Sequence, residues 1–92
     1  MSKFSLGQVV MTRGIANELE QDTKFAKFVT ESLKRHATGD WGDLGEEDKS
    51  SNEYALENDL RIFSAYIRED KKIYIITEWD RSYTTILFPS EY

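Results

Sequence analysis

The sequence predicts an α+β fold, a small antiparallel sheet of three or four strands with one main helix packed on one face. Two observations support this class. Residues 23–36 carry apolar side chains at helical spacing, and residues 60–88 contain three extended segments separated by two polar turns. The 92 residues suit one domain, which we place at 1–92.

The first predicted elements are a strand over residues 5–12 and a short helical turn over 15–21. Val9, Val10 and Met11 favour an extended chain, and Arg13-Gly14 then interrupts it. We expect this strand to join the three C-terminal strands, which would give the sheet four strands.

The main helix is predicted over residues 23–36. Asp22 or Thr23 can cap its start, and Gly39 is a stop signal after its basic last turn. Apolar positions at i, i+3, i+4, i+8 and i+11 form one face, which consists of Phe25, Phe28, Val29, Leu33 and His36. A polar, glycine-rich loop follows, and a second short helix is predicted over 51–57.

The C-terminal third predicts a three-stranded meander over 60–68, 72–79 and 83–88, with turns at 69–71 and 80–82. Both faces of the middle segment carry bulky side chains, which indicates a central strand. On one face these are Ile73, Ile75, Thr77 and Trp79.

Charge is concentrated in one segment. The chain has 12 basic and 17 acidic residues, and residues 40–59 hold eight of the acids but only one lysine. That segment has a net charge of −7 and the remainder +2. It is either a solvated surface or an acidic face for a basic protein partner. The candidate partner-binding acids are Glu46, Glu47, Asp48, Glu53 and Glu57. The overall charge of −5 argues against direct contact with nucleic acid.

The chain contains no cysteine, which excludes disulfides, thiolate zinc sites and a cysteine nucleophile, and agrees with a cytoplasmic protein. The apolar runs are short, so we expect neither a signal peptide nor a membrane span.

One candidate metal site lies where the main helix ends. His36 precedes a loop containing Asp40 and Asp43, and zinc accepts such mixed nitrogen and oxygen ligands. Glu78 or Asp80 could complete the set. The alternative is a hydrogen-bonded structural histidine, with Asp40 serving as a turn residue. For Asp80 the simpler role is likewise a turn, together with Ser82.

Trp41 stands in the glycine-rich loop between these acids. A tryptophan in such a loop either plugs the loop onto the core or anchors a partner interface. We therefore count Trp41 among the candidate partner-binding residues.

A small nuclease or nuclease-like toxin is the alternative function. Its base, acid and phosphate-binding groups would come from His36, Glu78, Arg81 and either Tyr66 or Tyr83. The acidic segment argues against it, because it would repel phosphate.

Four strings carry a resemblance to a known family: HATGDWGDL (36–44), NEYAL (52–56), RIFSAY (61–66) and IITEWDRSYTTILFPSEY (75–92). Together they resemble a family of small plasmid-related proteins carried on plasmids, phages and integrative elements. The resemblance implies a non-enzymatic inhibitor of host defence. An anti-CRISPR protein that binds a type II effector nuclease is the expected form, because such effectors hold nucleic acid in positively charged channels.

Overall fold

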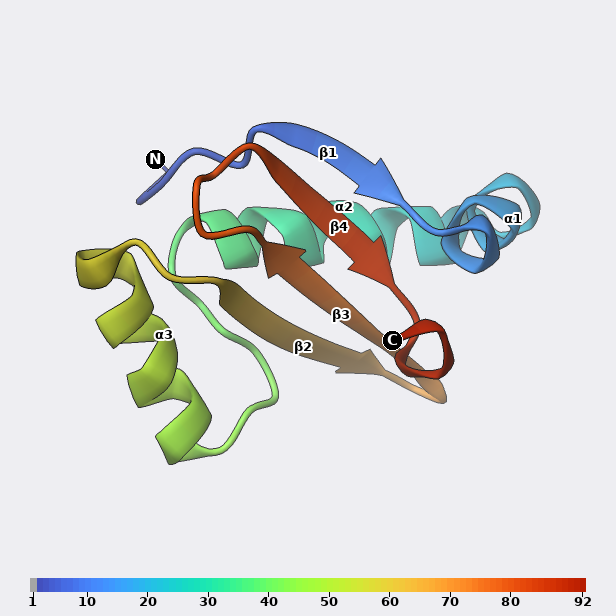
Figure 1. The fold of residues 1–92 in the computed structure, drawn as a ribbon. Coiled ribbons are helices and arrows are strands. Elements are labelled where there is room, and N and C mark those ends of the chain that lie inside the picture. Colours follow the sequence, from blue (N-terminus) through green and yellow to red (C-terminus); the bar gives the residue numbers. More distant parts are fainter. Residues whose placement is uncertain (1) are drawn as a thin grey trace.

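The computed structural model describes residues 2–92 and confirms the α+β class, with three helices and a four-stranded sheet (Figure 1). The elements are β1 (Gln8–Met11), α1 (Arg13–Gln21), α2 (Thr23–Ala37), α3 (Glu46–Asn58), β2 (Ile62–Arg68), β3 (Lys71–Thr77), β4 (Tyr83–Leu87) and a final 3₁₀ turn η1 (Pro89–Glu91).

The sheet has the strand order β1-β4-β3-β2. Strands β2, β3 and β4 form the predicted antiparallel meander, and β3 lies inside the sheet as expected. The fourth strand differs from the prediction, because β1 pairs parallel to β4, with Val9 opposite Thr84 and Met11 opposite Ile86. The sheet is therefore mixed, with β1 at one edge and β2 at the other.

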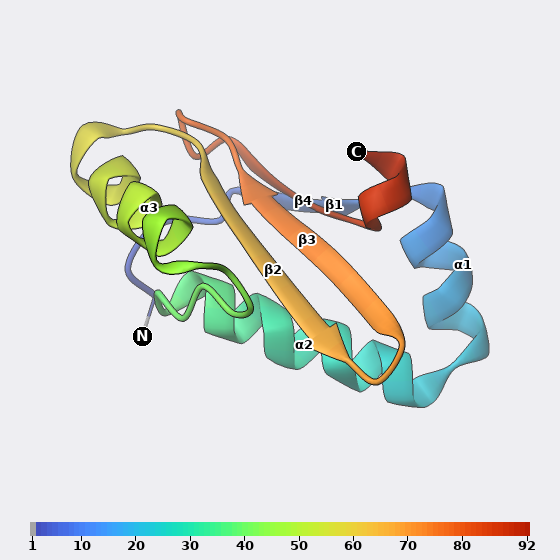
Figure 2. The ribbon, with the colours of Figure 1, turned by 90° about the horizontal axis from the view of Figure 1, so that it is seen from below.

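Helix α2 covers one face of the sheet, and α1 packs against α2 (Figure 2). The Asp22 carboxylate accepts the backbone N–H groups of Lys24 and Phe25, at 2.9 and 3.2 Å, and so caps α2 as predicted. Four of the five residues on its predicted apolar face are buried and Leu33 packs against the core. The helix is therefore held by this face.

Two helices begin earlier than the sequence predicts. Helix α1 starts at Arg13, and its first turn is capped from the far end of the chain by Glu91. This carboxylate accepts from the Thr12 hydroxyl at 2.6 Å and the Gly14 N–H at 3.0 Å. Helix α3 starts at Glu46 instead of residue 51, and the three acids of its first turn suit the positive end of the helix dipole.

A second, smaller core lies between α3 and the sheet. It consists of Trp41, Ala55 and Ile62, with Leu44, Leu56 and Phe4 packed around them. This core holds the glycine-rich loop and α3 against the β2 side of the sheet.

The outer edge of β2 is closed by groups that take the place of a further strand. The Asn52 side chain donates to the Phe63 carbonyl at 2.7 Å and accepts the Phe63 N–H at 3.1 Å. The N–H of Asp43 then donates to the Ala65 carbonyl, and its carboxylate accepts the Ile67 N–H. Gly42 makes this approach possible, because it has a φ of +78° and a Cβ there would collide with the Ala65 carbonyl. We call this set of contacts the closed edge.

Within residues 2–92, no helix combines the length and the apolar character needed to cross a membrane.

Candidate functional site

Helix α3 lies at one end of the molecule, beside β2 (Figures 1 and 2), and it is the candidate site because it carries the five candidate acids. Tyr54, in the third turn, is 61% exposed among these acids, whereas Asn52 and Ala55 are buried on the opposite side. All five predicted partner-binding acids are exposed: Glu46, Glu47, Asp48, Glu53 and Glu57. The helix therefore presents a charged outer face with an aromatic ring in it.

Arg81 anchors the end of this helix. Its guanidinium donates to the Ala55 carbonyl at 3.0 Å and to the Leu60 carbonyl at 2.6 Å. It also donates to the Glu78 carbonyl of its own turn, where Arg81 itself has a φ of +59°. The guanidinium adds a donor at the C-terminal end of α3, where a positive charge suits the helix dipole. Arg81 thus fixes α3 to the β3–β4 turn.

Trp41 takes the first of its two expected roles, as a plug. It is 3% exposed in the second core, and its indole N–H donates to the Glu53 carboxylate at 2.7 Å. The prediction that Trp41 itself anchors a partner is corrected by this burial, because a buried ring offers no surface for docking. Its contribution to the acidic face is indirect, through the orientation of Glu53.

His36 lies fully buried at the end of α2, where it joins three strands. Its Nδ1 is 2.6 Å from the Ser64 hydroxyl and its Nε2 is 2.9 Å from the Thr77 hydroxyl. The Thr77 hydroxyl contacts that of Thr84 at 2.7 Å, and Thr84 donates to the Leu6 carbonyl at 2.7 Å. The structure therefore supports the hydrogen-bonded interpretation of His36.

One arrangement of protons satisfies this whole chain of contacts. The Thr84 proton goes to the Leu6 carbonyl, which only accepts, so Thr77 must donate to Thr84. Thr77 then needs a proton from His36 Nε2, and Nδ1 accepts from Ser64. We assign the neutral Nε2–H tautomer on this basis. Burial favours this uncharged form and lowers the pKa of His36 to about 4.

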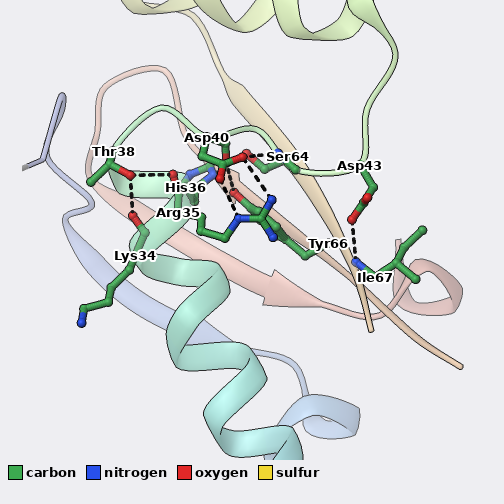
Figure 3. A network of polar contacts seen from close by, with 10 residues as sticks. Lys34, Arg35, His36, Thr38, Asp40, Asp43, Ser64, Tyr66 and Ile67 are labelled. Atoms are coloured by element: carbon green, nitrogen blue, oxygen red, sulfur yellow. Dashed lines mark hydrogen bonds and ion pairs between the residues drawn. The ribbon is translucent and has the colours of Figure 1, made fainter. Parts of the chain in front are cut away.

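The two loop aspartates bond to partners other than His36, namely Arg35 and the Ile67 backbone (Figure 3). Asp40 pairs with the Arg35 guanidinium through both oxygens, at 2.7 and 3.2 Å, and also accepts the Gly42 N–H. The hydrogen bond from Arg35 lowers the pKa of Asp40. Asp43 accepts from Ile67 in the closed edge. Asp40 is thus the turn residue that the alternative interpretation expected.

The other two candidate ligands also have partners. Glu78 pairs with Arg61 at 3.3 Å, and Asp80 accepts from the backbone and hydroxyl of Ser82, in the turn role predicted for it. In the described part of the chain, no three His, Asp or Glu side chains are grouped closely enough to hold a metal. Zinc at His36, Asp40 and Asp43 stays a prediction, and it would require His36 to release a hydroxyl partner.

Elemental analysis of the untagged protein tests this prediction. If the metal site exists, we expect about one zinc ion per chain. A chelator should then lower the melting temperature, because the metal binds the folded state. A zinc content near zero with an unchanged melt would contradict it and leave His36 in its hydrogen-bonded role.

The residues of the nuclease alternative do not meet at a surface. His36 and Tyr66 are fully buried, and Tyr66 donates to the Asp40 carbonyl at 2.7 Å. Arg81 is committed to the carbonyls that end α3. His36 and Tyr66 are therefore closed to a substrate phosphate in this structure, whereas Tyr83 is 43% exposed.

The sequence analysis missed Asn52 and the capping role of Arg81 at α3, and it missed the partners of His36, which are Ser64, Thr77 and Thr84. The small polar strand residues carried a signal, since Ser64, Thr77 and Thr84 alternate with the apolar inward residues of their strands, and a histidine stands on the apolar face of α2. An inward polar residue must find a partner.

Comparisons of the chain with protein-family models, with curated proteins and with solved structures gave no match.

Proposed function

We propose that this protein is a non-enzymatic inhibitor of host defence, an anti-CRISPR protein that binds a type II CRISPR effector nuclease through the outer face of α3. The observation that carries the proposal is the acidic helix itself. Its acids face solvent, whereas its inner side is anchored through Asn52, Ala55 and Arg81.

Anchoring matters because a rigid charged surface binds without first losing conformational freedom. Helix α3 is short of apolar contacts, yet its start, middle and end are each tied to the rest of the fold. The second core holds the loop before it, Asn52 holds its middle to β2, and Arg81 holds its end. The acids therefore keep a fixed spacing on the surface.

The partner surface is expected to be basic. An effector nuclease holds its nucleic acid in a positively charged channel, and an acidic helix has an electrostatic reason to enter it. The resemblance to proteins of mobile elements points to the same class of partner. Tyr54, exposed among the acids, supplies an aromatic contact of the kind that anchors protein interfaces.

A charge-reversal experiment tests the proposal. We expect the triple variant Glu46→Lys, Glu47→Lys, Glu57→Lys to lose at least about tenfold in affinity for a purified type II effector, measured by biolayer interferometry. Glu53 stays unchanged because it bonds Trp41. Wild-type binding should also weaken as salt rises, since exposed charges are screened.

The matched control is the triple variant Glu20→Lys, Glu31→Lys, Asp70→Lys, which changes the net charge equally at exposed positions away from α3. It should bind like the wild type, and both variants should keep the wild-type circular dichroism spectrum. Equal losses in the two variants would show a net-charge effect without a site on α3. Failure of the wild type to bind any effector of this class would overturn the proposal.

A further inference from the structure

The two edges of the sheet differ in whether their outward backbone groups have hydrogen-bond partners. At the β2 edge, side chains and a loop occupy the outward backbone groups, as described for the closed edge. β1 forms the other edge, and no helix or strand of residues 2–92 lies beyond it (Figure 1). An open edge presents unpaired N–H and C=O groups that can pair with another extended chain.

The outward groups of β1 belong to Val9 and Met11. Gln8 and Thr12 donate their N–H groups to the carbonyls of Ser82 and Ile86, both at 3.1 Å. Successive residues of a strand direct their backbone groups to opposite sides, so Val9 and Met11 direct theirs away from β4. Their side chains are 37% and 42% exposed.

We propose that β1 pairs with β1 of a second copy of this chain, in an antiparallel arrangement that joins the two sheets into one. The strand is self-complementary for this pairing. Val9 would exchange its hydrogen bonds with Met11 of the second copy and Met11 with Val9, while Val10 lies on the twofold axis. Such an isologous contact closes on itself.

The side chains and charges favour a second copy at this edge. Natural sheet edges are often protected by lysine or proline, but the four residues of β1 are uncharged and none is proline. Pairing would place apolar side chains opposite apolar side chains, which stabilises cross-strand pairs. The acidic helix α3 lies at the β2 edge, so the two copies would carry their acidic helices at the far ends of the joined sheet. Their mutual repulsion would then be small.

The contact is short, so we expect a weak dimer that depends on concentration. In sedimentation equilibrium, the average mass of the full chain should rise from 10.7 kDa toward twice that value between about 10 µM and 1 mM. Over the same range, hydrogen exchange of the Val9 and Met11 amides should slow, whereas that of Val10 should not change.

The decisive variant is Val9→Pro. Proline removes an N–H that the monomer does not use, and it is tolerated at such an edge position. We expect this variant to stay monomeric at the highest concentration and to keep the wild-type circular dichroism spectrum. If it fails to fold, Met11→Lys is the second variant, since a charge on the strand also opposes pairing. The matched control is Ile67→Lys, an exposed position at the β2 edge, which should dimerise like the wild type.

Two results would overturn the proposal. One is a wild type that stays monomeric over the whole range, which would leave the β1 edge to a strand of another protein. The other is a dimer that survives both Val9→Pro and Met11→Lys, which would place the contact elsewhere, for example on the sheet face opposite α2.

Discussion

Replacing Trp41 by alanine is expected to lower the free energy of unfolding by about 3–5 kcal/mol, out of the roughly 5–15 kcal/mol typical of a small domain. The ring is 3% exposed and fills the second core with Ala55 and Ile62. Its removal leaves a cavity and takes away the indole donor of Glu53. Urea denaturation, monitored by circular dichroism at pH 7, measures the change.

The chain carries its own control, because its second tryptophan is exposed. Trp79 lies just beyond β3 and is 62% exposed, so Trp79→Ala should change stability by no more than about 0.5 kcal/mol. Equal losses in the two variants would contradict the role of Trp41 as the plug of the loop. A selective loss in Trp41→Ala would also connect the second core to α3, and with it to the acidic surface.

Acidification is expected to destabilise the protein through His36. Its folded pKa is about 4, below the ordinary value of 6.5, so between these values the unfolded chain binds the additional proton. The stability that depends on the neutral His36 is therefore fully present above pH 6.5. It is lost progressively as the pH falls toward 4. One proton corresponds to about 1.4 kcal/mol per pH unit, so from pH 7 to pH 5 we expect a loss of about 2 kcal/mol.

The window from pH 7 to 5 isolates the histidine from the carboxylates. Asp40 and Glu91 also have lowered pKa values, because they accept hydrogen bonds from Arg35 and Thr12, but they lose their charge only in more acidic solution. Urea denaturation at pH 7, 6 and 5 measures the slope. His36→Gln, which does not titrate, should show a flat profile in this window, even if its stability is lower throughout. A flat profile in the wild type would contradict the buried, neutral histidine.

The outcome for the helices shows what sequence periodicity can predict. Helix α2 followed from its apolar spacing and its Asp22 cap, because it packs with one face on the sheet. The start of helix α3 was predicted five residues too late, because its first turns are acidic and make no apolar face. Its packing rests on Asn52 and Ala55, which have helical spacing, but one is polar and the other small, so they form no apolar stripe in the sequence. The sequence pattern could not predict the parallel pairing of β1 with β4 either. The direction of this pairing depends on how α1 and α2, which lie between the two strands in the sequence, pack in the fold, which is a tertiary property.

The candidate site shows a similar division. The acids of α3 were identifiable from composition alone, since exposure of charged side chains needs no tertiary information. The metal hypothesis combined His36 with Asp40 and Asp43 because they are close in sequence. The last turn of α2 instead turns His36 inward, while Asp40 folds back onto Arg35. Residues that are close in sequence at the end of a helix can therefore lie on different sides of it, as His36 and Asp40 do.

The closed edge has a consequence for how large an assembly this chain can build. A sheet with two open edges can add copies without end, which is the geometry of a fibril. Within residues 2–92, the Asn52 amide and the Asp43 carboxylate close the β2 edge, so β1 is the sheet edge that stays open for the proposed pairing. A molecule with one open sheet edge can pair with one other copy, and the assembly then stops at a dimer. The same contacts that position α3 therefore also block the addition of a strand at the β2 edge.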